Sequence, residues 1–245
     1  MRLKNILLST GVAAVMSAMV GGCGDDFLDT PVQNAISSDI LASSQSGVEA
    51  SLISVYKMLN GFTNTVGNTW GSAPSNYIFN SASDDVHKGS EPSDNPNGYF
   101  EISLYQWGPG LLAFQDKFQA VYEGIRRANN TIQLAGEFQS KGGDAVVAAR
   151  IISEAKFLRT WYHFEAYKMW KNVPYYDETD ADFRKENNED IIPKLVADLD
   201  AAIAGLPANK TQVGRVDKTV AQALQGIIKL YVKDYAGAKT AFTAV

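Results

Sequence analysis

Apolar residues recur at helical spacing along most of the chain, so the sequence predicts an all-α fold. A first helix is expected over about residues 46–59. The longest apolar stripe, with steps of four and three, contains Phe114, Phe118, Val121, Ile125, Ala128 and Ile132. Because a continuous apolar stripe normally packs against neighbouring helices, we expect these side chains to lie in the core.

A helix over residues 145–170 is predicted to be apolar on two sides. One side carries Ile151, Ala155, Leu158, Tyr162 and Met169, and the other carries Phe157, Trp161 and Phe164. A helix of this kind must lie between neighbours. It should end before Val173-Pro174, because proline disfavours the helical conformation for the residue that precedes it.

Two more helices are predicted further along the chain. The first carries Ile192, Leu195, Leu199 and Ala202 and stops at Gly205 and Pro207, which are typical of helix ends. The second carries Val220, Leu224, Ile227 and Tyr231. A tetratricopeptide-like spacing, in which a glycine lets two helices approach, is found at Gly226, Tyr235, Ala238 and Phe242. Gln222 and Lys229 depart from that repeat, so an ordinary helical hairpin is the alternative.

A long polar stretch over residues 60–110 separates the first helix from the apolar stripe, and we predict that it is an irregular, aromatic-rich loop insertion. Its aromatic residues include Trp70, Tyr77, Phe79, Tyr99, Phe100, Tyr105 and Trp107. Loops of this length are usually functional or disordered, and scattered aromatic residues argue against disorder. An aromatic face packs against the apolar side of a sugar ring while Asn, Asp and His reach its hydroxyl groups, so the composition suits a carbohydrate. Alternatively, Tyr99 and Trp107 only pin the loop to the helices.

The N-terminus has the pattern of a secretory signal. Arg2 and Lys4 precede an apolar run that is short for a transmembrane helix and ends at Gly21-Gly22, just before Cys23. This arrangement resembles a bacterial lipobox, which implies a signal peptide over residues 1–22, a lipid on Cys23 and an acylated tether over residues 23–38. An ordinary signal peptide followed by an incidental cysteine is the alternative.

The residues after Cys23 indicate where in the cell the protein is sent. Asp25-Asp26 resembles the export signal that sends Bacteroidetes lipoproteins to the outer face of the outer membrane. We therefore expect a lipid-anchored protein at the cell surface. The rest of the chain, residues 39–245, is expected to form one helical repeat domain.

Composition excludes several classes of function. The chain has 22 Lys and Arg against 27 Asp and Glu, and removal of the signal would take away Arg2 and Lys4, so we expect no nucleic-acid partner. Cys23 is the only cysteine. If it carries a lipid, no thiol is left for a disulfide, a thiolate metal site or cysteine catalysis.

Few residues could support catalysis or metal binding. Glycoside hydrolysis needs two carboxyl groups that converge on one bond, whereas the adjacent Asp84 and Asp85 point apart in an extended loop. His87 is the only histidine of the loop, and His163 lies among apolar helix residues where a core role is the default. A calcium ion could be held by Asp84, Asp85 and Asp94, but oxygen ligands alone at this spacing are weak evidence for such a site. We predict no catalytic residue, no metal and no cofactor.

Several sequence stretches, in order, resemble the SusD/RagB family of surface lipoproteins. Phe27-Leu28-Asp29-Thr30-Pro31 resembles the family's mature start. The other stretches are Tyr122 to Asn130, Glu154 to Arg159 with the aromatic residues that follow it, Val173-Pro174, Leu206-Pro207 and Gly214-Arg215-Val216. The resemblance implies a tetratricopeptide-like helical repeat scaffold and covers only the N-terminal half of the family's usual length, so we expect a chain that is truncated C-terminally.

The family resemblance also implies a function and a site. It implies a surface protein that binds oligosaccharide or polysaccharide and delivers it to a TonB-dependent, SusC-like transporter. The ligand-binding loop of the family follows a serine-aspartate pair, matched here by Ser83-Asp84, and this implies a site at His87, Asp94, Asn95, Asn97 and Tyr99. Peptide binding, in a charged groove lined by Glu123, Arg126 and Arg127, is the alternative, and a glycoside hydrolase is a third.

Overall fold

The described part of the chain is a stack of helices, with no strand in it. The structure, a computed structural model, describes residues 37–60, 79–87, 89, 91, 93, 99–209 and 212–245. Its helices are α2 (Ser38–Leu41), α3 (Gln45–Lys57), the 3-10 helix η2 (Met58–Asn60), α5 (Tyr99–Ser103), α6 (Leu112–Ser140), α7 (Ala145–Trp170), α8 (Ile192–Gly205), α9 (Lys218–Tyr231) and α10 (Tyr235–Thr243). The predicted signal peptide, Cys23 and most of the tether lie outside these residues.

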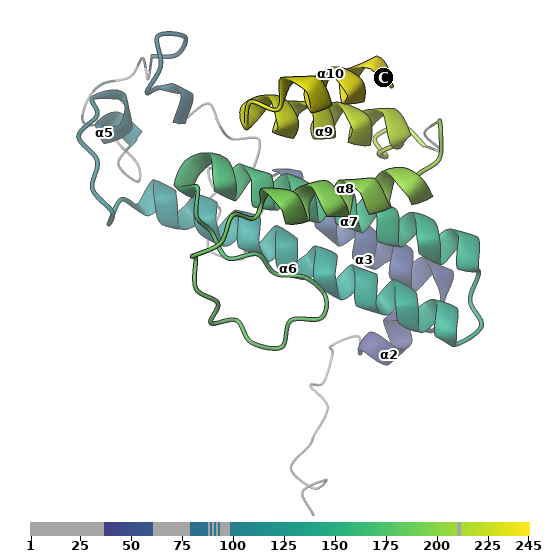
Figure 1. Cartoon of the computed structure of the whole chain (residues 1–245). Coiled ribbons are helices and arrows are strands. Elements are labelled where there is room, and N and C mark those ends of the chain that lie inside the picture. Colours follow the sequence, from purple (N-terminus) through teal and green to yellow (C-terminus); the bar gives the residue numbers. More distant parts are fainter. Residues whose placement is uncertain are drawn as a thin grey trace, which may run out of the picture. The chain divides into compact units, whose positions relative to one another are not determined.

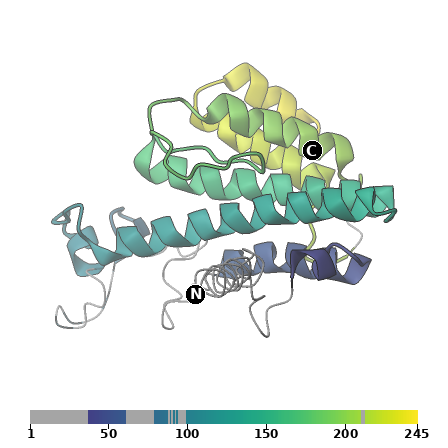
Figure 2. The same ribbon diagram turned by 90° about the horizontal axis from the view of Figure 1, so that it is seen from below.

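The long helices α6 and α7 form the centre of the domain (Figure 1). Figure 2 shows α3 on one side of this pair and α8, α9 and α10 on the other. The two long helices approach closely where Gly124 of α6 faces Tyr162 of α7. A Cβ at position 124 would lie 2.6 Å from the tyrosine ring, so this approach requires a glycine. The Tyr162 hydroxyl donates a hydrogen bond of 2.8 Å to the carbonyl oxygen of Val55, which ties α3 to α7.

Short polar residues start several helices. The side chains of Asp144, Asp217 and Asp234 accept hydrogen bonds from backbone N–H groups in the first turns of α7, α9 and α10. These N–H groups have no partner within the helix, so an N-cap carboxylate stabilises each helix start. α7 ends at Trp170, and the buried Val173 and the partly buried Pro174 follow outside any helix, as the sequence predicts.

The prediction of an all-α repeat scaffold is confirmed. α7 begins and ends at the predicted residues and is buried on both of its apolar sides, with Ile151, Leu158 and Tyr162 on one and Phe157 and Phe164 on the other. In the α9–α10 hairpin, a Cβ on Gly226 would lie 2.6 Å from the ring of Phe242. This is the close approach that the tetratricopeptide-like spacing predicted.

Two predicted apolar faces are wrong in part. Phe118 was expected in the core but is 40% exposed, and Lys117 beside it is buried instead. In α9, Val220, Ile227 and Tyr231 are exposed. The face of α9 that packs against its neighbours carries Ala221, Leu224, Gly226 and Ile228, so Val220, Ile227 and Tyr231 lie outside it.

Within the described residues of the loop insertion, Tyr99–Ser103 form the short helix α5, a regular element that the prediction did not include. Ile102 of α5 and Ala113 of α6 are buried together and pack against Phe79, Ala82 and Leu111. Trp107 lies 5.4 Å from the ring of Tyr105 and 6.4 Å from that of Phe114 in α6. These contacts support the interpretation that Trp107 pins the loop to the helices.

The length and apolarity needed to cross a membrane are not found together in any helix of the described residues.

Candidate functional site

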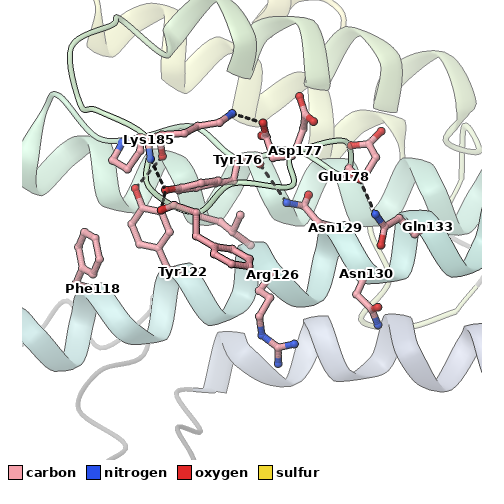
Figure 3. A pocket seen from close by; sticks show the side chains of 14 residues that line it. Phe118, Tyr122, Arg126, Asn129, Asn130, Gln133, Tyr176, Asp177, Glu178 and Lys185 are labelled. Atoms are coloured by element: carbon pink, nitrogen blue, oxygen red, sulfur yellow. Dashed lines mark hydrogen bonds and ion pairs between the residues drawn. The ribbon is translucent and has the colours of Figure 1, made fainter. Parts of the chain in front are cut away.

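A cleft of about 600 Å³ runs along α6, opposite the segment that connects α7 to α8 (Figure 3). We call this segment, residues 171–191, the α7–α8 segment, and the hollow the α6 cleft. One wall is the α6 face that carries Phe118, Tyr122, Arg126, Asn129, Asn130 and Gln133, and the other wall comes from the α7–α8 segment. These α6 residues recur at steps of four and three, so one continuous helix face lines the cleft.

Aromatic rings gather at one end of the α6 cleft. The rings of Phe118 and Tyr122 lie 4.4 Å apart, and Tyr176 of the opposite wall is 6.1 Å from Tyr122. Phe183 also lines the cleft although 85% of it is exposed. The Tyr122 hydroxyl donates a hydrogen bond of 2.9 Å to the carbonyl oxygen of Pro174, and burial raises the pKa of this hydroxyl. Tyr122 is therefore held in place by its hydrogen bond, whereas the rings of Phe118 and Phe183 are exposed and can contact a ligand.

Amide side chains continue the α6 wall beyond the aromatic rings. The Asn129 side chain donates a hydrogen bond of 3.3 Å to the carbonyl oxygen of Tyr176. Gln133 donates one of 2.6 Å to the carbonyl oxygen of Glu178. Asn130, between them, is exposed, and its side chain forms no hydrogen bond within the described residues. These bonds tie the two walls together, and the amide of Asn130 can both donate to and accept from a ligand.

The cations that line the cleft are paired with carboxylates. Arg126 donates from Nε and Nη2 to the two carboxylate oxygens of Glu123, each at 2.8 Å. Lys185 forms an ion pair with Asp180 and donates to the carbonyl oxygen of Tyr175 at 3.1 Å. A bidentate arginine–carboxylate pair fixes the geometry of both groups, so Arg126 is held against its own helix.

Asp177 is held by neutral donors. Its Oδ1 accepts hydrogen bonds from the backbone N–H of Thr179 at 2.9 Å and from the Thr179 hydroxyl at 2.6 Å. Burial acts to raise the pKa of Asp177, but these bonds and the charges of Arg159 and Lys185 hold it below its usual value. Asp177 is therefore ionised at neutral pH.

A buried arginine supports the cleft from beneath. Arg159 of α7 donates to Asp198 of α8 at 2.7 and 2.6 Å and to Asn129 of α6 at 2.8 Å, and it also donates to Glu178. Tyr175 donates to the same Asp198 at 2.8 Å. Burial opposes the charge on Arg159, but Asp198 and the other negative partners outweigh it and raise the pKa. This network joins three helices and the α7–α8 segment at one point.

His163 lies beside this network as a buried neutral imidazole. Its Nε2 accepts a hydrogen bond of 3.1 Å from the backbone N–H of Tyr176, so Nδ1 carries the proton and donates to the carbonyl oxygen of Arg159 at 3.0 Å. The ring stacks on Tyr175 at 4.6 Å. Burial and the positive charge of Arg159 lower the pKa of His163 to about 3. The core role predicted for this histidine agrees with these contacts.

His163 should make the stability of the protein depend on pH. Its pKa is about 6.5 in an unfolded chain, so below that pH only the unfolded state takes up this proton. We expect the free energy of unfolding to fall by about 1.2 kcal/mol through this group as the pH drops from about 6 to 5. Urea denaturation at several pH values measures the slope, and His163→Gln, which keeps an acceptor for Tyr176, should flatten it.

A slope that His163→Gln leaves unchanged would contradict this assignment. Carboxylates with lowered pKa values do not account for a slope of the free energy of unfolding between pH 6 and 5. The folded-state pKa values of Asp177 and Glu178 are also lowered, and their contribution has the same sign, but it is lost only near and below their usual values of 3.8 and 4.5.

The predicted loop site is described only in part. His87 is exposed, and its Nδ1 accepts a hydrogen bond of 3.0 Å from the backbone N–H of Gly89. Asp94, Asn95 and Asn97 lie outside the described residues, and Tyr99 begins α5 with a side chain that is also outside them. The site therefore stays a prediction. No group of His, Cys, Asp or Glu side chains suited to a metal ion occurs in the part of the chain that the structure describes.

The charged groove expected for a peptide is formed only in part. Arg126 lines the α6 cleft, but Arg127 turns toward α3 and donates to the carbonyl oxygen of Ser54 at 3.1 Å. The cleft itself was not predicted. Its signal in the sequence is a second stripe on α6, aromatic at Phe118 and Tyr122 and polar from Arg126 to Gln133, beside the apolar one.

A family model for SusD-like proteins, described as "Starch-binding associating with outer membrane", matches residues 26–231. No curated protein matches the chain. Among solved structures, a laminarin-binding SusD-like protein is 24% identical with a TM-score of 0.66, and the match covers 80% of this chain and 42% of that one.

Two further solved structures are similar to this chain. A SusD-like carbohydrate-binding protein from Bacteroides fragilis is 24% identical with a TM-score of 0.67, over 83% of this chain and 40% of that one. Surface glycan-binding protein A from Bacteroides thetaiotaomicron, in complex with laminarihexaose, is 20% identical with a TM-score of 0.65, over 80% of this chain and 41% of that one. At these identities the likeness shows the fold. The chain spans about two fifths of the length of these structures.

Proposed function

The chain belongs to the SusD-like family, and on this premise we propose that it is a cell-surface lipoprotein that binds a glycan in the α6 cleft. The lipid on Cys23 holds it at the outer membrane, and residues 23–38 serve as the tether. The bound oligosaccharide or polysaccharide passes to a TonB-dependent, SusC-like transporter. The solved structures it resembles are named as carbohydrate- and glycan-binding proteins, which supports this function.

One observation carries the assignment of glycan as the ligand: open aromatic faces lie beside amide side chains in a single cleft. The ring of Phe118 is partly exposed and that of Phe183 is almost fully exposed, so both can pack against the C–H side of a sugar ring. Asn130 and Gln133 follow on the same helix face and reach the hydroxyl groups that point away from such a stack. Pockets for small ligands commonly combine apolar walls with a few placed polar groups.

We propose binding without bond cleavage. A glycosidase needs one carboxyl group whose pKa is raised, so that it can act as an acid, and a second one opposite it. In the α6 cleft, Asp177 and Glu178 have lowered pKa values, and Glu178 is committed to Arg159. Neither of them can act as the general acid at neutral pH.

Affinity electrophoresis tests whether the ligand is a glycan. We expect the full chain, extracted in lauryldimethylamine oxide because this detergent has no sugar head group, to be retarded by at least one polysaccharide of a plant, host and microbial panel. Bovine serum albumin on the same gels controls for sieving. Retardation by no polysaccharide, for a protein whose circular dichroism is helical, would contradict the proposal and favour a peptide ligand instead.

A further inference from the structure

We propose that the α6 cleft binds a run of several sugars of one glycan chain, with a ring subsite at one end and a separate amide subsite at the other. The ring subsite is formed by Phe118 and Tyr122, and the amide subsite by Asn130 and Gln133. This inference rests on the proposed function, because it specifies how much of a glycan the same cleft recognises. A glycan of one or two sugars would occupy a single subsite and bind weakly.

The α6 wall of the cleft is long, because the groups that form it are spread over about four turns of one helix. The row consists, at steps of four and three, of Phe118, Tyr122, Arg126, Asn130 and Gln133. Since an α-helix rises about 1.5 Å per residue, the row is about 22 Å long, and most of its members are about 6 Å apart. That spacing is close to the breadth of one sugar ring, so successive turns of α6 can face successive sugars (Figure 3).

One sugar cannot contact both ends of this row. The ring of Phe118 is 40% exposed and can pack against the C–H side of a sugar, and the ring of Tyr122 lies 4.4 Å from it. Asn130 lies about 18 Å further along the helix axis. A sugar that stacks on Phe118 is therefore out of reach of Asn130, and only a chain of sugars contacts both.

The polar groups of the row have donors and acceptors left for hydroxyl groups. The Asn130 side chain forms no hydrogen bond within the described residues, so its amide can both donate and accept. Gln133 donates its NH₂ group to the carbonyl oxygen of Glu178 and keeps its own side-chain carbonyl oxygen. Arg126, midway along the row, donates to Glu123 from Nε and Nη2 and keeps the N–H donors of Nη1. Binding groups therefore continue along α6 beyond the rings.

Asn129, the residue before Asn130, supports the assignment by contrast. Its side-chain oxygen accepts a hydrogen bond of 2.8 Å from Arg159, and its NH₂ group donates one of 3.3 Å to the carbonyl oxygen of Tyr176. Both of its polar groups thus hold the second wall of the cleft against α6. The same turn of the helix carries one amide that is committed to the fold and one, at Asn130, that is left for a ligand.

Asn130→Ala is the variant that isolates the amide subsite. It removes no hydrogen bond of the described residues, and alanine favours a helix more than asparagine does, so we expect the fold to be kept. The matched control is Gln139→Ala, which removes an exposed amide from the same helix at a position that does not line the cleft. Circular dichroism checks that both variants are as helical as the wild type.

Titration calorimetry with oligosaccharides of single length tests the inference. The probe is the partial hydrolysate of the polysaccharide that most retards the full chain, fractionated from the disaccharide to the octasaccharide. For the full chain in lauryldimethylamine oxide, we expect affinity to rise by about tenfold from the disaccharide to the hexasaccharide and to change little beyond it. Asn130→Ala should weaken binding of the octasaccharide by about fivefold, a loss typical of one hydrogen bond, and leave the disaccharide unchanged. Gln139→Ala should bind every length as the wild type does.

The outcomes separate this inference from the proposed function. A disaccharide that binds as tightly as the octasaccharide would overturn the run of sugars and leave glycan binding intact. A loss in Asn130→Ala that is equal at every length, or absent at every length, would overturn the separate amide subsite, as would an equal loss in Gln139→Ala. If no polysaccharide of the panel retards the full chain, the proposed function and this inference fail together.

Discussion

Replacing Arg159 with methionine is expected to destabilise the protein by about 3 to 5 kcal/mol, which is the usual cost of leaving a buried charge without its partner. Arg159 and Asp198 are both buried, and the Asp198 carboxylate accepts two hydrogen bonds from Arg159. Removing the guanidinium leaves that carboxylate away from water with only the Tyr175 hydroxyl as a donor. Urea denaturation followed by circular dichroism measures the loss.

A double variant distinguishes the stranded charge from lost packing. Arg159→Met with Asp198→Leu removes both partners, and we expect it to recover much of the stability, because apolar replacement of a whole buried ion pair is often neutral. Equal stability of Arg159→Met and the wild type would show that the network does not support the fold. A double variant as unstable as the single one would assign the loss to packing instead.

Replacing Tyr162 with alanine is expected to cost about 3 to 5 kcal/mol, as for other large aromatic side chains in a core. The ring is fully buried and faces Gly124, where no side chain is present to fill the space that it leaves. The hydrogen bond to the Val55 carbonyl oxygen is lost as well. The free energy of unfolding in urea measures the total.

Two other variants separate the contributions of this tyrosine. Tyr162→Phe keeps the ring and removes only the hydroxyl, so we expect a loss of about 1 kcal/mol. Trp161→Ala, at the partly exposed neighbouring position, should cost less than Tyr162→Ala. A larger loss in Trp161→Ala than in Tyr162→Ala would contradict the burial on which this prediction rests.

The helices could be predicted from the sequence because their apolar periodicity is strong. The bounds of α7 and α8 follow from stripes that end at Val173-Pro174 and at Gly205. The family resemblance, taken from short motifs in order, is confirmed by the family match. Periodicity tells which residues share a face but not whether a neighbour covers that face. This is why Phe118 and Ile227 were placed wrongly in the core.

The α6 cleft could not be predicted, because it depends on contacts between residues far apart in the sequence. Its second wall is the α7–α8 segment, which has no periodic pattern and is positioned by bonds such as those from Tyr122 to the Pro174 carbonyl oxygen and from Asn129 to that of Tyr176. Arg159 belongs to a recognisable motif, yet its role depends on Asp198, 39 residues away. Nothing in the local sequence indicates that pairing.

The location of the glycan in the α6 cleft is the central claim, and titration calorimetry of three single variants tests it most directly. The ligand is an oligosaccharide of whichever polysaccharide retards the full chain. Phe183→Ala removes an exposed ring of the cleft and keeps the backbone carbonyl to which Tyr176 donates. Tyr235→Ala removes a ring of α10 that is 65% exposed and does not line the cleft. Tyr99→Ala probes the predicted loop site.

We expect Phe183→Ala to weaken binding by about tenfold, which corresponds to about 1.4 kcal/mol, and Tyr235→Ala to bind as the wild type does. Wild-type affinity in Phe183→Ala together with lost affinity in Tyr99→Ala would contradict the claim and place the glycan in the loop.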